Sequence, residues 1–337
     1  MAAQKKNGLQ TVWFQSPPVI ISAASVVGFR EGEGPLGKTF DKVVYDSYYG
    51  EKTWEKAEQR MMLDAMKKAL QKAGLQEKDV DFILAGDLLN QIISANFTAS
   101  SMSVPFLGLY GACSTMYEGM ALGAMLIDGG FADRVLVATS SHYSTAERQY
   151  RFPTELGIQR PLTAQWTVTG AGAMLLAREG TGPVITHATI GRAIDMGQGD
   201  PMDMGAAMAP AAADTIMQHF VDTGRRPDYY DLIITGDLGA YGKKLAEQIL
   251  AKNGYDIADR FTDCGILIYS GSQDVHAGGS GCGCSAVVTC GYLMEQLKSG
   301  RYKRFMGVGT GALMSPCSVQ QGETIPGIGH AVVIEAR

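Results

Sequence analysis

Cys113 is the residue of this sequence best placed to do chemistry. It lies in "GLYGACSTMYEGMALGAMLIDGG", after a Gly-rich turn and before an apolar stretch that predicts a helix. Free amides at a helix start favour an anion, so they would increase the thiolate character of Cys113, or bind a carboxylate. A buried, unreactive cysteine fits the same position. The residue is therefore a candidate nucleophile, pocket wall or core residue.

A nucleophilic Cys113 would need a base and oxyanion donors, usually His or Asn. The comparable segments of the second half read "IITGDLG" and "HAGGSGCGCS". They offer Gly236 and Asp237 in the first and Gly279 and Ser280 in the second, with neither His nor Asn at those places. His276 is close in sequence, but a single loop histidine is more often a surface residue.

The elements that would position these residues occur twice. "VDFILAGDLL" (Val80 to Leu89) matches "YDLIITGDLG" (Tyr230 to Gly239), and the Cys113 stretch corresponds to "GGSGCGCSAVVTCGYL". Strands alternate with helices, such as the one predicted from Trp54 to Ala73 and ended by Gly74. We therefore predict two similar α/β halves with mostly parallel sheets, residues 1–179 and 180–337. Two unrelated α/β domains are the alternative.

Composition narrows the function classes. The net charge is −5 without a long basic run, which argues against nucleic-acid binding. The apolar stretch "PVIISAASVVGF" is too short to span a bilayer, and the polar start does not predict a signal peptide. Six cysteines in this chain are expected to be reduced. The spacing of Cys282 and Cys284 does not match a zinc site, so we expect no bound metal.

Several motifs resemble the thiolase and ketoacyl-synthase superfamily. "GACSTMYEGMALGAMLIDGGFADRVLVATSS" is similar to its nucleophile-cysteine segment, and "TVTGAGAMLLA" to its Gly-Asp-Gly-Ala-Gly-Ala strand, with Thr169 in place of Asp. "GVGTGALMSP" resembles its closing Gly-rich loop. The resemblance implies a five-layered αβαβα fold of two duplicated halves. The family's catalytic His falls on Gly236 and its Gly-Asn turn on Gly279-Ser280, so Cys113 is a vestigial nucleophile position and condensation is in doubt.

A narrower resemblance is to a sporulation branch of that superfamily in endospore formers. It rests on "AGDLLNQ", "YGACSTM", "SSHYSTAERQYRFPTE", "DMGAAMAPAAADTI" and "AGGSGCGCSAVVT". It implies a non-enzymatic protein that binds dipicolinic acid, with or without calcium, and takes part in its uptake into the developing spore and its release in germination. The implied partners are membrane proteins of the same operon at the spore inner membrane, where this chain would be peripheral. Relatives of this fold also form homodimers, so a homodimer is expected by analogy.

Dipicolinate is a flat dianion, so its pocket needs donors and cations. The resemblance suggests a ligand-binding set made of Cys113, Ser114, His142, Arg148, Gly236, Asp237, Gly279 and Ser280. Arg148 and Arg151 could instead form ion pairs with Glu147 and Glu155. The alternative function is an acyl-CoA-dependent acyltransferase that uses Cys113, with His276 or Asp237 as its base.

Overall fold

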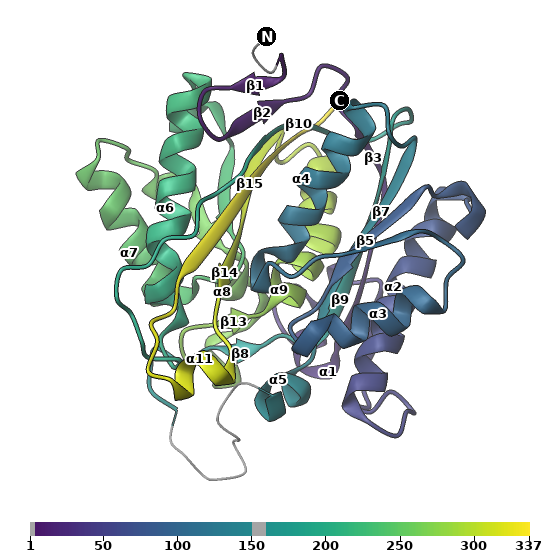
Figure 1. Cartoon of the computed structure of the whole chain (residues 1–337), viewed down its shortest axis with the longest axis horizontal. Coiled ribbons are helices and arrows are strands. Elements are labelled where there is room, and N and C mark those ends of the chain that lie inside the picture. The colour runs from purple at the N-terminus through teal and green to yellow at the C-terminus, as the bar shows by residue number, and fades with distance from the viewer. Residues whose placement is uncertain (1–3, 150–159) are drawn as a thin grey trace.

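The computed structural model describes residues 4–149 and 160–337 (Figure 1). Ten of its strands follow one another in hydrogen-bonded order and form two groups of five. The first group is β6 (Phe106–Gly108), β5 (Phe82–Gly86), β7 (Arg134–Ser141), β9 (Gly170–Ala177) and β3 (Val19–Gly28). The second is β12 (Phe261–Asp263), β11 (Leu232–Thr235), β14 (Arg304–Ala312), β15 (Gly327–Glu335) and β10 (Val184–Thr189).

The two groups repeat one pairing pattern. In the first, β5 is parallel to β6 and β7, while β9 is antiparallel to β7 and β3. In the second, β11 is parallel to β12 and β14, while β15 is antiparallel to β14 and β10. The order of strands along the chain is also the same in both groups, as a duplication predicts. The change from one group to the other falls between β9 and β10, at residues 178–183.

The prediction of mostly parallel sheets is wrong, because half of these pairings are antiparallel. Continuous apolar runs such as "GAGAMLLA" in β9 identify strands that are buried on both faces. Burial on both faces does not fix the direction of a strand. Direction depends on how the chain returns to the sheet, which the apolar pattern does not contain.

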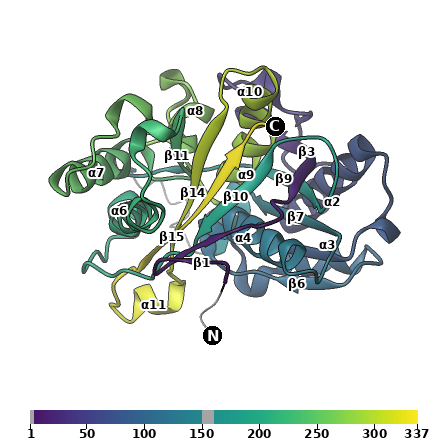
Figure 2. The ribbon, with the colours of Figure 1, turned by 90° about the horizontal axis from the view of Figure 1, so that it is seen from above.

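Helices form three layers around the two strand groups (Figures 1 and 2). Helices α2 (Trp54–Ala73) and α3 (Ile93–Ser100) cover the outer face of the first group. Helices α6 (Met204–Thr223) and α7 (Gly239–Lys252) cover that of the second. Between the groups lie α4 (Thr115–Asp128) and α9 (Cys282–Val288), the latter continued by a π-helical turn (Thr289–Leu293) and α10 (Met294–Lys298).

Small residues allow the central helices to approach the strands closely. A methyl group at Gly172 of β9 would lie 2.6 Å from the carbonyl carbon of Ala286 in α9. A methyl group at Gly283 would lie 2.7 Å from the Gly170 carbonyl oxygen. These contacts are shorter than side chains tolerate, so the two glycines determine how closely α9 packs against β9.

The predicted outer helix is confirmed at both ends. In α2 the Thr53 side chain accepts a hydrogen bond from the Lys56 N–H, and Gly74 ends the helix with a left-handed φ of 67°. The remaining short elements connect the layers: β1 (Lys6–Asn7), β2 (Thr11–Trp13), β4 (Lys42–Val44), β8 (Trp166–Thr167), β13 (Gly279–Ser280), α1 (Phe29–Gly32), α5 (Tyr143–Gln149), α8 (Cys264–Ile268) and α11 (Pro316–Gln320).

Candidate functional site

Cys113 lies in a short 3₁₀ turn (Ala112–Ser114) that leads directly into α4. Ala112 has a φ of 50°, a left-handed conformation that is unusual for a residue with a side chain. The turn is held by its own side chains: Ser114 Oγ donates to the Gly111 carbonyl at 2.6 Å and Thr115 Oγ1 to the Ala112 carbonyl at 2.6 Å. Such a conformation at the head of a central helix is typical of a functional position.

The second half brings a carboxyl group to Cys113. Asp237 follows β11 and is fully buried. Its carboxyl group accepts hydrogen bonds from Thr310 Oγ1 at 2.6 Å, from the Gly281 N–H at 2.9 Å and from Ser280 Oγ at 3.3 Å. The Cys113 thiol is a further hydrogen-bond partner. Asp237 thus connects β14, the start of α9 and the start of α4.

The charges around Cys113 differ from those of an activated thiol. Burial raises the pKa of Asp237, while the Thr310 hydroxyl and then the Gly281 N–H act in the opposite direction. Burial also raises the pKa of the neighbouring Asp263 to about 7, although Thr235 Oγ1 donates to it at 2.7 Å. A carboxyl group hydrogen-bonded to a thiol opposes formation of the thiolate. The helix start at Cys113 is therefore counteracted by an acidic neighbour.

Cys113 lines a cavity of about 330 Å³. Its hydroxyl groups come from Tyr110, Ser280, Ser315 and Ser318, and its larger apolar walls from Leu88, Met204, Leu313 and Met314. No Lys, Arg or His lines this cavity among the residues that the structure describes. The cavity can therefore hold a small molecule with apolar faces and several hydrogen-bond acceptors.

Of the predicted ligand-binding residues, Cys113 and Ser280 line this cavity and Asp237 is bonded to both. Ser114 and Gly279 have structural contacts: Ser114 Oγ bonds within its turn, and the Gly279 carbonyl accepts from Gln165 Nε2 at 3.0 Å.

Gly236 is not among the described residues that line the cavity. A methyl group on it would lie 3.3 Å from Ser285 Cβ and 3.3 Å from Thr310 Oγ1. Gly236 is therefore packed closely against Ser285 and Thr310.

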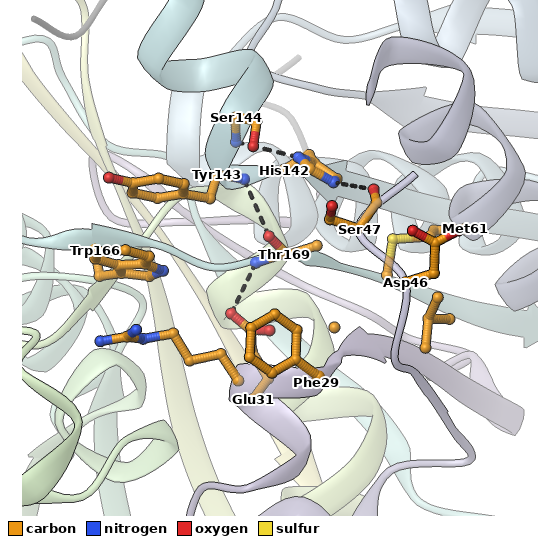
Figure 3. Close-up of a pocket in the computed structure, with 13 residues that line it drawn as sticks. Phe29, Glu31, Asp46, Ser47, Met61, His142, Tyr143, Ser144, Trp166 and Thr169 are labelled. Carbon is orange, nitrogen blue, oxygen red and sulfur yellow. Dashed lines mark hydrogen bonds between the residues drawn. The ribbon is translucent and has the colours of Figure 1, made fainter. Parts of the chain in front are cut away.

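The structure places His142 and Arg148 away from the Cys113 cavity. His142 lines a separate cavity, where its Nε2 lies 2.9 Å from the Ser47 carbonyl oxygen and its Nδ1 accepts from the Ser144 N–H at 3.1 Å (Figure 3). Burial lowers the pKa of His142, which favours the neutral ring. Arg148 forms an ion pair with Glu55 and lies over the Trp54 ring at 5.3 Å.

Other residues considered from the sequence have separate environments. Arg151 and Glu155 lie outside the described residues. His276 is exposed, with Nδ1 2.7 Å from the Pro161 carbonyl oxygen and Nε2 3.1 Å from Asp274. Within residues 4–149 and 160–337, no group of three or more His, Cys, Asp or Glu is arranged to hold a metal ion.

Sequence reasoning missed several residues of the cavity. Leu313, Met314 and Ser315 belong to "GVGTGALMSP", which by its sequence resembles only a closing Gly-rich loop. These three residues directly follow β14, the strand that corresponds to β7, and that position was a usable signal. Tyr110 lies in "YGACSTM", three residues before Cys113, but its residue type alone does not mark it as a cavity residue. Met204 lies in "DMGAAMAPAAADTI" in the second half, and only the packing of the two halves brings it to the Cys113 cavity.

Two duplicated strand groups around paired central helices, with a cysteine at the head of one helix, define a thiolase-like protein. The fold is similar to 3-oxoacyl-[acyl-carrier-protein] synthase III from Aquifex aeolicus VF5 (TM-score 0.58, 16% identity, 94% of this chain and 99% of that chain). It is also similar to cerulenin-bound OleA from Xanthomonas campestris (TM-score 0.62, 16% identity, 96% of this chain and 97% of that chain).

The particular family follows from the sequence comparison. The family described as Stage V sporulation protein AD matches residues 8–335. The chain is 51% identical over 331 residues to Stage V sporulation protein AD of Bacillus subtilis (strain 168), which covers 98% of each protein. This chain belongs to the stage V sporulation protein AD family. In the part of the chain that the structure describes, no helix is both long and apolar enough to cross a membrane.

Proposed function

We propose that this sporulation protein is a non-catalytic binder of dipicolinic acid that holds its ligand in the Cys113 cavity. The observation that carries the proposal is the hydrogen bond between the Cys113 thiol and the buried Asp237, in a cavity whose described lining contains no histidine. The sporulation family supplies the biological context. The protein would take part in moving dipicolinic acid into the developing spore and in its release in germination.

The immediate surroundings of Cys113 favour binding over acyl transfer. Acyl transfer needs a group that removes the thiol proton and donors aimed at the developing oxyanion. Asp237 is fully buried and already accepts hydrogen bonds from three further donors, so it is occupied as an acceptor. The two histidines that the sequence offers as candidates, His142 and His276, do not line the Cys113 cavity.

The size and polarity of the cavity suit a flat, oxygen-rich molecule. Its volume of about 330 Å³ is at the small end of typical ligand pockets. The apolar side chains of Met204 and Leu313 would lie against the pyridine ring, and the hydroxyl groups of Ser280 and Ser315 would donate to carboxylate oxygens.

Charge favours the calcium chelate of the ligand over the free dianion. Asp237 lies behind the cavity, and no cationic side chain is among its described lining residues. A free dianion would therefore meet no compensating charge there. Dipicolinate that arrives with Ca²⁺ bound to its oxygens is neutral as a unit and avoids this cost. The calcium would thus enter with the ligand and would not occupy a protein site.

The edge strand β6 supports the proposed homodimer. β6 pairs with β5 on one side, and among the described residues no strand pairs with its other side. Leu107 of β6, Phe97 of α3 and Tyr110 are exposed. An unpaired strand edge with apolar neighbours is typical of an interface. Tyr110 also lines the Cys113 cavity, so pairing here would place a second copy beside the ligand. Sedimentation of a Leu107→Lys variant as a monomer would support this interface.

Membrane association is proposed through protein partners. Membrane proteins encoded with this chain would hold it at the spore inner membrane, since the described helices include no candidate span. Co-purification of the chain with such membrane proteins from sporulating cells tests this part of the proposal.

Calorimetry with dipicolinate, with and without equimolar calcium, tests ligand binding. We expect saturable binding that is tighter with calcium, is retained by Cys113→Ala and is lost in Cys113→Trp, which fills the cavity. No heat change at millimolar ligand in either condition would overturn the proposal. Intact mass after incubation with acyl-CoA tests the alternative: the mass should stay unchanged, whereas a stable adduct on Cys113 would favour an acyltransferase.

A further inference from the structure

A second cavity of about 260 Å³ lies at the end of β3, bounded by α1, β4, α2 and the start of α5 (Figure 3). It shares no lining residue with the Cys113 cavity. The proposed function gives it no role. Its lining combines a buried acid, Glu31, with aromatic side chains.

Glu31 is 1% exposed, and within residues 4–149 and 160–337 only one of its two carboxyl oxygens accepts hydrogen bonds. Oε1 accepts hydrogen bonds from the Thr169 N–H at 3.0 Å and from the Tyr269 hydroxyl. Oε2 is buried and has no hydrogen-bond partner among the residues that the structure describes. Burial raises the pKa of Glu31, while the Tyr269 hydroxyl and the Thr169 N–H act in the opposite direction. A buried acceptor without a donor is costly, and a ligand that donates there would remove that cost.

Gly28 leaves Glu31 Oε2 uncovered, because it has no side chain. Gly28 also lines the cavity, and a methyl group on it would lie 2.8 Å from Glu31 Oε2. Any larger residue at position 28 would therefore press on the free oxygen.

The walls favour a cationic ligand with an apolar body. The rings of Tyr143 and Trp166 are stacked, with centroids 3.8 Å apart and planes at 6°, and Phe29 adds a third aromatic ring. Val44 and Met61 are buried apolar side chains in the same lining. Tyr143 covers one face of the Trp166 ring and the Arg30 guanidinium the other. Phe29 is therefore the ring of these three best placed to attract a ligand cation. The apolar side chains accommodate hydrocarbon.

The charged groups of the lining have an acidic excess. Asp46 accepts hydrogen bonds from the Gly50 N–H and then the Tyr48 N–H, which lower the pKa of its carboxyl group and favour its anionic form. His142 has a lowered pKa because it is buried. Among the described lining residues the cation is Arg30, which donates to the Gln273 carbonyl and lies 4.0 Å from the centroid of the Trp166 ring.

We propose that this cavity binds a small organic ammonium ion whose nitrogen donates to Glu31 Oε2 and whose apolar body contacts Val44 and Met61. A dianion such as dipicolinate would face the carboxyl groups of Glu31 and Asp46 and is disfavoured. The two cavities therefore select ligands of different charge, and the second site does not depend on the proposed function of the first.

Benzylamine, benzyl alcohol and benzoate are suitable probes, because they share a ring and differ in charge. Tryptophan fluorescence, which includes Trp166, and calorimetry should report saturable binding of benzylamine that is at least 10-fold tighter than that of the other two. Glu31→Gln should weaken benzylamine binding at least 10-fold, because the amide keeps an oxygen for Thr169 and Tyr269 but loses the charge. Glu33→Gln, a matched change at an exposed neighbour, should leave it unchanged.

Gly28→Ala gives a second variant that keeps every charge. Its methyl group should cover Oε2 and weaken benzylamine binding as Glu31→Gln does, while dipicolinate binding in the Cys113 cavity is unaffected. The inference is overturned if benzylamine gives no saturable signal at millimolar concentration, if benzoate binds as tightly, or if folded Glu31→Gln and Gly28→Ala proteins both bind benzylamine as the parent does.

Discussion

The contact between Cys113 and Asp237 predicts that the acid suppresses the reactivity of the thiol. The test is Asp237→Asn. The side-chain amide can keep its oxygen toward the Gly281 N–H and turn its NH₂ group toward Thr310 Oγ1, a hydroxyl that can also accept. The substitution therefore preserves the shape of the site and removes its negative charge. We expect Cys113 to become more reactive toward alkylating agents.

The expected size of the effect follows from Coulomb's law. Two unit charges roughly 4 Å apart at an effective dielectric constant of about 20 repel by about 4 kcal/mol, which corresponds to about 1,000-fold in thiolate population. The average negative charge that the Asp237 carboxyl group presents to Cys113 is less than one unit, because burial favours the protonated form. Three further hydrogen-bond donors also draw on that charge. We therefore expect alkylation of Cys113 to accelerate about 10- to 100-fold.

The assay is the rate of iodoacetamide labelling, measured peptide by peptide with mass spectrometry at about pH 8. Cys317 is exposed and provides an internal control in the same molecule, while Cys282 and Cys284 are buried and should label slowly in both proteins. Dividing the Cys113 labelling rate by the Cys317 rate corrects for differences in reagent concentration and pH between the two samples. Circular dichroism should show that Asp237→Asn remains folded.

An unchanged or smaller rate ratio in folded Asp237→Asn protein would refute this reasoning. It would mean that Asp237 is neutral near Cys113 or that the carboxylate assists deprotonation. Assistance by Asp237 would be the behaviour of a general base, and would favour the acyltransferase alternative.

Two further predictions concern stability. Burial lowers the pKa of His219 to about 3, so the folded chain excludes a proton that the unfolded chain binds below about pH 6.5. The melting temperature should fall as the pH drops from about 6.5 to 4, and less steeply in His219→Gln. Gly172→Ala should lower the free energy of unfolding in urea by about 1–3 kcal/mol through contact with Ala286, whereas Gly271→Ala, which meets no atom within 4 Å, should change it by less than about 0.5 kcal/mol. A flat melting profile, or equal effects of the two glycine variants, would contradict them.

The sequence was sufficient for the fold class and for the position of Cys113. The repeated Gly-Asp-Leu strand ends predicted the duplication, and the same pairing pattern appears in both strand groups. Local rules also placed the helix Trp54–Ala73, because its cap, periodicity and glycine end are close in sequence. Strand direction was not predictable, since apolar runs report burial and not direction.

The sequence by itself determined which residues stand at the strand ends and helix starts, including Cys113 and Asp237. Only the tertiary structure decided which of them meet. It paired Cys113 with Asp237, took His142 to a different cavity and left Arg148 with Glu55. The physical reason is that helix and strand formation depends on neighbours in sequence. The contacts of a site depend on how two packed halves are seated against each other, which is set by close approaches such as Gly172 against Ala286.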